Sequence, residues 1–345
     1  MLKIAFLFTE PLLDAGGVGR VSEILANEFQ KAGHECIFLA LQGIERRKEP
    51  TLRQEIFPDP NPNSPKARAY LLNFIEENGV DVLINQSGLN LKNLRLVKSV
   101  SERVQVIHVH HNCINDLIKH HTSIVSAALQ RRRLSPRLLP SFIFSLLRKR
   151  ATKRLGRAIR NCTSDGDHLT VLFDVFREEA RSIGRLSSAK QIAAIPNPSP
   201  YIASPETLAQ KKKQILFVGR IEYAQKRIDR LCRIWESVAG QLSDWTLEII
   251  GDGPDTERVS EWSRKTGVQR ARYHGFQNPR RFFEESSIFL LTSDFEGFGM
   301  VLVEAQALGC VPISTRSFSA IDSVVLPDES GLLYEPCDEQ GMCEG

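Results

Sequence analysis

Short apolar runs alternate with stretches of helical periodicity along the whole chain. Residues 3–8 form the first run, and apolar residues then recur at helical spacing from Val21 to Phe29, where Gly33 is placed to end a helix. Further strand-like runs occupy residues 36–41, 80–84, 104–109, 159–163 and 192–195. Such alternation is typical of βα units around a parallel sheet.

The texture of the sequence changes at residues 196–200, where three of five residues are proline. A second series of strand-like runs follows at residues 215–218, 246–250, 271–274, 288–291 and 311–314. We therefore expect an α/β fold of two tandem doubly wound, Rossmann-like parallel-sheet domains, residues 1–199 and 200–345, that face a cleft. Ligands bind beside the carboxyl ends of the strands in such sheets, so the loops there are the candidate sites.

Composition limits the class of protein. The chain has 345 residues, of which 42% are hydrophobic and 25% are charged, enough for two globular domains. No apolar run approaches the roughly 18 residues that span a bilayer, and the apolar start of the chain is too short for a signal-peptide core. We expect a cytoplasmic protein. Its seven scattered cysteines, none at CxxC spacing, are expected to be reduced and mostly buried.

The net charge of +4 conceals one strongly basic segment. Residues 117–161 contain twelve Lys or Arg and no Asp or Glu. Within residues 119–160, basic clusters flank an apolar stretch from Leu138 to Leu147, a pattern typical of a helix that lies on anionic lipid. The alternative is a solvated basic face on a core helix. RNA binding is a third interpretation, but no stacking or Gly-basic motif accompanies the charge, and we expect no nucleic-acid partner.

The clearest candidate site follows the fourth run of the second series. A glycine-containing turn there leads into a predicted helix, residues 300–308, which Gly309 ends. Gly297 and Gly299 let the backbone approach a ligand, and the free amides at the helix start favour an anion. Glu304, a little over one turn inside, is placed to accept hydrogen bonds from a vicinal diol such as a ribose. The alternative is a plain strand, turn and helix with a solvated glutamate.

Other strand ends of the second domain carry cations and glycines. Arg220 follows Gly219 at one strand end and Lys226 lies in the same loop, so two cations facing an amide-rich helix start would clamp a diphosphate. The alternative is a pair of surface cations. Two more strands are followed at once by glycines, namely Gly251, Gly253 and Gly275. Together these loops predict a cleft for a nucleoside diphosphate.

These pieces occur in the order found in one known family. The C-terminal half of the chain resembles the donor domain of the retaining GT-B glycosyltransferases of family 4. The matching pieces are Gly219-Arg220 with Lys226, Gly251-Asp252-Gly253-Pro254, His274-Gly275, and the segment from Glu296-Gly297-Phe298-Gly299 to Glu304-Ala305. The segment Ile195-Pro196-Asn197-Pro198 resembles the inter-domain segment of the same family. The resemblance therefore extends over about residues 190–336.

The resemblance implies a role for each matching residue. Arg220 and Lys226 would hold the donor diphosphate in place of a metal ion, and Glu304 would bind the ribose hydroxyls. Glu296 and the backbone of Gly297, Phe298, Gly299 and Met300 would contact the transferred sugar and the phosphate. The resemblance implies no metal and no cofactor beyond the nucleotide-sugar substrate. Arg227 departs from the family, which usually has glycine there, and would either tighten or crowd the diphosphate site.

A glycine-containing loop also follows the first strand of the chain. It comprises Gly16, Gly17, Gly19 and Arg20, but the third glycine of a dinucleotide fingerprint is missing because Ser22 takes its place. The resemblance places this loop against the phosphate of the donor or against the acceptor. The alternative is a flexible connector.

Three histidines, His108, His110 and His111, gather at a strand end of the first domain. Zinc is disfavoured because no carboxylate occurs at ligand spacing until Asp116. The resemblance places one histidine of this strand end beside the reaction centre, hydrogen-bonded to the donor sugar, and we prefer His111, with His110 next. Asp165-Gly166-Asp167 imitates the metal-binding DxD of other glycosyltransferases, but we interpret it as a helix start.

The resemblance therefore implies a retaining, metal-independent glycosyltransferase with the catalytic set His111, Glu296, Arg220 and Lys226. Its partners would be a nucleotide-sugar donor and a saccharide or lipid-linked acceptor in lipopolysaccharide, capsule or exopolysaccharide synthesis. The basic segment would allow the cytoplasmic enzyme to bind the anionic inner face of the cytoplasmic membrane. The alternatives are a nucleotide-sugar epimerase of similar fold and a truncated, inactive relative that binds membrane or nucleic acid. The last is considered because family members usually continue beyond Asp338 with further helices that pack on the second domain.

Overall fold

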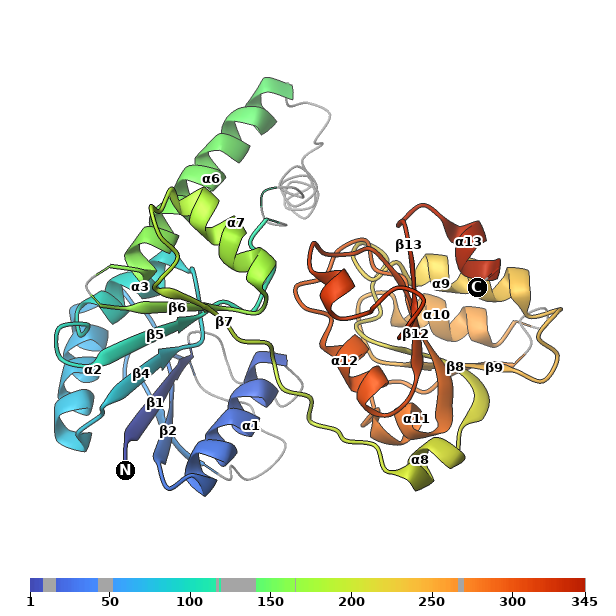
Figure 1. Cartoon of the computed structure of the whole chain (residues 1–345), viewed down its shortest axis with the longest axis horizontal. Helices are drawn as coiled ribbons and strands as arrows, with labels where there is room; N and C mark the ends of the chain where they lie inside the picture. The colour runs from blue at the N-terminus through green and yellow to red at the C-terminus, as the bar shows by residue number, and fades with distance from the viewer. Residues whose placement is uncertain are drawn as a thin grey trace. The chain divides into compact units, whose positions relative to one another are not determined.

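The computed structural model describes residues 1–8, 17–42, 52–115, 118, 141–164, 166–265 and 270–344. Within this part the chain divides into two compact units, Met1–Pro198 and Ser199–Gly345. The division falls inside the proline-rich segment 196–200. Each unit is built on its own parallel sheet (Figure 1).

The N-terminal unit contains a seven-stranded parallel sheet in the order β3-β2-β1-β4-β5-β6-β7. Its strands are β1 (Lys3–Phe8), β2 (Glu35–Ala40), β3 (Arg53–Ile56), β4 (Val82–Asn85), β5 (Gln105–Val109), β6 (His168–Val171) and β7 (Ile192–Ala194). The helices that the structure describes here are α1 (Gly17–Lys31), α2 (Pro65–Asn78), α3 (Leu91–Lys98), α6 (Ser141–Cys162) and α7 (Asp174–Gly184).

The residues of β1 show how this sheet is covered on both faces. Ala5 and Leu7 pack in one buried cluster with Leu71 of α2. The intervening Phe6 packs in a second cluster with Ala26 of α1. Successive side chains of a strand point to opposite faces, so a strand with helices on both sides must be apolar throughout.

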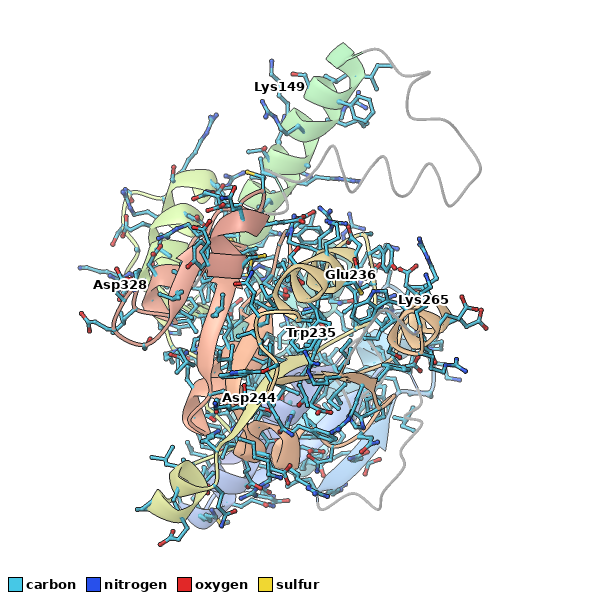
Figure 2. The ribbon with its side chains drawn as sticks, turned by 90° about the vertical axis from the view of Figure 1, so that its right-hand side faces the viewer. Lys149, Trp235, Glu236, Asp244, Lys265 and Asp328 are labelled. Atoms are coloured by element: carbon cyan, nitrogen blue, oxygen red, sulfur yellow. The ribbon has the colours of Figure 1, made fainter. Side chains whose placement is uncertain are left out.

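The C-terminal unit contains a six-stranded parallel sheet in the order β10-β9-β8-β11-β12-β13. Its strands are β8 (Lys212–Val218), β9 (Thr246–Ile250), β10 (Ala271–Tyr273), β11 (Ser286–Leu291), β12 (Val311–Thr315) and β13 (Leu332–Tyr334). Its described helices are α8 (Pro205–Ala209), α9 (Ile228–Val238), α10 (Thr256–Ser263), α11 (Arg280–Glu285), α12 (Met300–Ala307) and α13 (Glu339–Glu344). Trp235 of α9 anchors the core against Phe217 and Ile249 of the sheet (Figure 2).

Most of the strand predictions are confirmed, and one is wrong. Residues 159–163 were expected to form a strand, but α6 continues through Cys162. Leu155, Ala158, Ile159 and Cys162 are all buried, and their spacing is that of one helix face. The strands β3, β6 and β13 were not anticipated. Two of them lie at sheet edges, and all three are only three or four residues long, which leaves little pattern to detect.

The segment 165–167 is also not the helix start that was expected. Gly166 and Asp167 lead directly into β6, and Asp165 lies outside the described residues. Asp167 is buried and accepts a hydrogen bond from Lys98 Nζ at 3.2 Å, so it serves the packing of this unit.

The prediction that most cysteines are buried is confirmed for the described residues. Cys36, Cys113, Cys162, Cys232 and Cys310 are buried, Cys343 is partly buried and Cys337 is exposed, and all seven are free. Burial raises the pKa of the Cys36 thiol to about 11, so this thiol stays protonated at neutral pH.

The basic segment of the sequence forms the helix α6 over its second half, and its first half lies outside the described residues. The C-terminal half of α6 packs on its unit through Leu155 and Ala158, whereas Leu146 and the basic cluster Arg148 to Arg150 are exposed. Figure 2 labels Lys149 on this exposed part. No helix in the described ranges is long and apolar enough to cross a membrane.

Candidate functional site

The strand order of the C-terminal sheet reverses between β8 and β11, so the loops that follow these two strands lie side by side. The backbone N–H of Asp294 donates to the Gln225 carbonyl at 2.9 Å, and Gln225 Nε2 donates to the Phe295 carbonyl at 3.0 Å. Thr292 Oγ1 donates to the Lys226 carbonyl at 3.0 Å. Hydrogen bonds therefore hold the two loops together at the point where the strand order reverses, which is where doubly wound sheets bind ligands.

Lys226 and Glu296 meet at the centre of this structure. Lys226 Nζ lies 2.6 Å from Glu296 Oε1, and Ser293 Oγ donates to the same oxygen at 2.6 Å. The Lys226 side chain is 16% exposed and that of Glu296 is 7% exposed. Because a buried carboxylate needs partners, the ammonium and the hydroxyl satisfy the hydrogen bonding of Glu296, and Lys226 in turn has a fixed position.

The helix α12 begins directly after this pair. Gly299 precedes it with φ of +69°, and a Cβ there would lie 3.0 Å from the Leu302 side chain, so glycine suits this position. Phe298 is buried in the turn, and Glu304 is 4% exposed inside the helix. The segment Gly297 to Met300 leads into this helix, and Glu304 lies a little over one turn inside it.

Arg220 is exposed, unlike Lys226, and the two glycines after β9 lie where two loops meet. The Arg220 side chain is 60% exposed, and its Nε lies 3.7 Å from Glu222 Oε2. A Cβ on Gly251 would lie 1.8 Å from the Gly219 carbonyl oxygen, and one on Gly253 would lie 2.3 Å from the Ile221 carbonyl oxygen. These glycines therefore allow the loops after β8 and β9 to touch. Gly275 follows β10 with φ of +70°, but a Cβ there would meet no atom within 4 Å, so its backbone conformation alone favours glycine.

Arg227 shows why glycine suits its position and how an arginine is accommodated. Its φ is +50°, in the left-handed region that favours glycine. The guanidinium bonds Asp229 at 3.0 Å and Asp294 at 3.0 Å. These carboxylates raise the pKa of Arg227, Asp229 having the larger effect. The side chain therefore fastens the loop of Asp294 to the start of α9.

In the N-terminal unit, Gly17, Gly19 and Arg20 form the first turn of α1, which follows β1. Gly16 lies outside the described residues. The sheet order reverses between β1 and β4, so the turn after β4 is the neighbour of this region in the sheet.

The three histidines at the end of β5 have different surroundings. His108 is buried, with Nδ1 2.9 Å from Asn85 Nδ2 and Nε2 3.5 Å from Asp167 Oδ2, so both ring nitrogens serve the core. His110 is also buried. His111 is partly buried, and its Nε2 lies 2.5 Å from Gln86 Oε1. Within the described ranges no group of three or more His, Cys, Asp or Glu side chains is arranged to hold a metal ion.

Both His110 and His111 are held in the neutral form. Burial lowers the pKa of His110 to about 4, and the neighbouring His111 acts in the same direction. Burial also lowers the pKa of His111 to about 4, against a smaller opposing effect of the Asn197 side chain. Each imidazole therefore offers one N–H and one lone pair at neutral pH.

Several residues of these two sites were not anticipated from the sequence. Ser293 and Asp294 lie beside the predicted Glu296, but their partners come from other elements and leave no local signal. Asn85 and Gln86 follow a clear apolar strand, and two amides at a strand end were a signal that could have been used.

Two tandem units, each with a doubly wound parallel sheet, have the GT-B architecture of glycosyltransferases of known structure. The family model described as Glycosyltransferase Family 4 matches residues 15–198, and the model described as Glycosyl transferases group 1 matches residues 202–345. The chain belongs to the family 4 glycosyltransferases.

Three known proteins illustrate the relationship. The lipopolysaccharide 1,6-galactosyltransferase of Salmonella typhimurium is 31% identical over 184 residues, which are 51% of this chain and 50% of that protein, so the match spans half the length of this relative. An uncharacterized glycosyltransferase of Haemophilus influenzae is 24% identical over 100% of this chain and 89% of its own. The apo structure of the lipopolysaccharide outer core galactosyltransferase WaaB has the same fold, with a TM-score of 0.67 and 22% identity over 99% of this chain and 88% of its own.

Proposed function

We propose that this glycosyltransferase transfers a sugar from a nucleoside diphosphate to a lipid-linked saccharide in surface polysaccharide synthesis, with retention of configuration and without a metal ion. The observation that carries the proposal is the Lys226–Glu296 pair at the start of α12, with Glu304 inside that helix. The acceptor class is supported by the lipopolysaccharide galactosyltransferase among the relatives.

The chemistry of the site supports a diphosphate leaving group. As the bond to the sugar breaks, negative charge grows on the diphosphate, and preorganised cations and amides stabilise it. Lys226 is fixed by Glu296, Arg220 is exposed in the same loop after β8, and no side chain caps the start of α12 among the described residues. In this proposal Lys226 divides its hydrogen bonds between Glu296 and the phosphate, and Glu304 accepts hydrogen bonds from the ribose.

A thermal-shift panel of UDP, GDP, ADP and their sugar conjugates in EDTA tests the donor site. We expect one diphosphate series to stabilise the enzyme, and Arg220→Ala to remove most of this stabilisation. Arg220 is 60% exposed and, among the described residues, its one ion pair is the 3.7 Å contact with Glu222, so its loss should not disturb the fold. The matched control is Arg281→Ala, which removes a 79% exposed side chain on α11 and should bind as wild type does.

The other outcomes of the same panel point elsewhere. No stabilisation by any nucleotide would contradict the donor site and favour an inactive relative. Appearance of an epimer of the sugar, with no acceptor present, would favour an epimerase instead.

The exposed half of α6 supports a membrane surface as the partner. The helix carries seven Lys or Arg and no Asp or Glu, and its exposed Leu146 precedes the cluster Arg148 to Arg150. Anionic phospholipid of the inner leaflet would attract such a surface by about 1 kcal/mol for each basic residue. The location would bring the enzyme to a lipid-linked acceptor.

Vesicle flotation tests this partner. We expect the wild type to float with phosphatidylglycerol vesicles and not with pure phosphatidylcholine, and the double variant Lys149→Glu/Arg150→Glu to bind at least about 30-fold more weakly, from about 1 kcal/mol per residue. Arg280→Glu/Arg281→Glu makes the same charge change on α11 and serves as control. Equal binding to both kinds of vesicle, or equal loss in both variants, would refute the α6 surface.

A further inference from the structure

Six charged side chains of the C-terminal unit form a closed ring of ion pairs. They come from the loop after β8, the helices α9 and α13, and the loop after β11. Positive and negative charges alternate around the ring, and its six contacts measure between 2.6 and 3.5 Å. In order, the members are Arg227, Asp294, Arg230, Glu339, Arg233 and Asp229. The ring therefore joins both loops of the candidate site to α13.

Two of the three arginines hold a carboxylate with a pair of nitrogen atoms. Arg227 donates through Nε and Nη2 to the two oxygens of Asp229, each at 3.0 Å. Arg233 donates through Nε and Nη2 to the two oxygens of Glu339, at 2.9 and 2.6 Å. These hydrogen bonds lower the pKa of Glu339 below its ordinary value, so this carboxylate is charged at neutral pH. The third arginine, Arg230, is 4% exposed, and its Nε lies 3.5 Å from Glu339 Oε1 without a hydrogen bond. Forked pairs have a fixed geometry, so most of the ring is built of directed contacts.

Asp294 is the member of the ring that belongs to the loop of Glu296. Its Oδ1 accepts a hydrogen bond from Arg230 Nη2 at 2.9 Å, and its Oδ2 accepts one from Arg227 Nη1 at 3.0 Å. The preceding residue, Ser293, donates to Glu296 Oε1 at 2.6 Å. One short segment therefore carries two carboxylates, and each is fixed by side chains from outside the segment or next to it.

The ring closes because this chain has an arginine at position 227. Glycine usually occupies this position in the family that the sequence resembles, and without the guanidinium the ring would be open between Asp294 and Asp229. Arg227 has φ of +50°, a conformation that costs free energy for a residue other than glycine and persists where surrounding contacts hold it. The bonds to the two carboxylates are such contacts. Arg227 directly follows Lys226, so the ring begins beside the candidate site.

We propose that Asp294 is a positioning residue for the transfer reaction, because the ring holds its carboxylate and thereby fixes the loop that keeps Glu296 and Lys226 in place. Glu339 of α13 supports Asp294 through Arg230, which both carboxylates contact. The reaction itself rests on the proposed function. Asp294 acts through its loop and touches neither substrate. Since Lys226 would stabilise charge that grows as the bond to the sugar breaks, a loosely held loop should lower kcat more than it raises KM.

The first test measures the loop in the free enzyme, without donor or acceptor. The backbone N–H groups of Asp294 and Glu296 donate to the carbonyls of Gln225 and Ser317, each at 2.9 Å, so their hydrogen–deuterium exchange reports opening of the loop. Asp294→Asn keeps the size of the side chain but removes its charge. We expect this variant to exchange about tenfold faster in peptides from residues 292–299, and as wild type does in peptides from β9.

Kinetics with the donor that the nucleotide panel identifies give the second measurement. We expect Asp294→Asn to lower kcat about tenfold, with a much smaller change in the KM of the donor. The matched control is Asp244→Asn, which removes the same charge from an ion pair with Lys213 in the same unit and should behave as wild type in both measurements. A purely structural role of Asp294 would lower the melting temperature and leave kcat unchanged well below it.

The support from α13 is tested at the far side of the ring. Glu339→Gln removes the charge that pairs with Arg233 and Arg230, and it should lower kcat in the same direction as Asp294→Asn but by less. Because both changes would loosen one loop, the double variant should be about as active as Asp294→Asn alone. Effects that multiply would show that the ring does not connect Glu339 with the loop.

Unchanged exchange of the loop in Asp294→Asn, or an unchanged kcat, would overturn the positioning role. Tighter binding of the nucleotide would also overturn it, because Asp294 would then keep Arg227 away from the diphosphate. If Asp294→Asn does not fold, Arg227→Gly opens the ring at the neighbouring member with a residue that suits φ of +50°, and the same two losses are expected. If exchange rises as expected but no nucleotide sugar is turned over, the fixing of the loop stands and the proposed function fails, so the two failures are distinguishable.

Discussion

Lys226→Ala is expected to lower kcat/KM by a factor on the order of several hundred while the enzyme stays folded. The change removes the cation nearest to the charge that develops on the diphosphate, an interaction that typically contributes 10²- to 10³-fold. It also removes the ammonium from the Glu296 carboxylate, which is 7% exposed and accepts a hydrogen bond from Ser293 Oγ, so a buried negative charge would oppose the phosphate. Steady-state kinetics with the donor named by the nucleotide panel measure the effect.

A matched control and a double variant make this prediction specific. Lys213→Ala removes a 61% exposed lysine at the start of β8, where it pairs with Asp244. This variant should be as active as wild type. Adding Glu296→Gln to Lys226→Ala removes the unpaired charge, so donor binding should recover in part while kcat stays low. Activity of Lys226→Ala within a few-fold of wild type would mean that this lysine does not bind the diphosphate.

Arg230→Ala is expected to destabilise the C-terminal unit by about 3 kcal/mol. Arg230 lies on α9 with a side chain only 4% exposed. Its guanidinium donates to the buried Thr292 carbonyl at 2.6 Å and to Asp294 Oδ1 at 2.9 Å, and it lies 3.5 Å from Glu339 of α13. Truncation leaves a buried carbonyl without its donor in the loop that carries Glu296. Urea denaturation followed by circular dichroism gives the free energy of unfolding.

Arg233 provides the comparison within the same helix. Its side chain is 47% exposed and pairs with Asp229 and Glu339, so Arg233→Ala should cost less than about 1 kcal/mol. Equal losses of unfolding free energy in Arg230→Ala and Arg233→Ala would show that Arg230 contributes no more than an ion pair at the surface. Arg230→Lys, which keeps the charge but not the fork of donors, should fall between them.

The sequence predicted the parts of the fold in which one local pattern was enough. Continuous apolar runs such as β1 and β8 mark strands that are covered on both faces, and glycine marks the left-handed turn before α12. The prediction failed where the pattern was short or belonged to two structures. Residues 159–163 are apolar enough for a strand, but their neighbours from Leu155 onward place them in a helix.

The site was predicted as a set of strand ends, and its internal contacts were not. Glycines and cations after β8 and β11 pointed to Lys226 and Glu296, but the bond between them joins residues 70 positions apart. Arg227 was expected either to tighten or to crowd the diphosphate site. The structure directs its guanidinium to Asp229 and Asp294, which no local spacing could predict.

The central claim is a transfer of sugar from a nucleoside diphosphate that depends on protein cations alone. It is tested most directly by incubating the enzyme in EDTA with the donor identified by the nucleotide panel and a lipid-linked saccharide acceptor, and by following the anomeric proton of the product by NMR. We predict a glycosylated lipid whose new linkage has the anomeric configuration of the donor. A product of inverted configuration, or turnover only after a divalent metal is added, would contradict the claim.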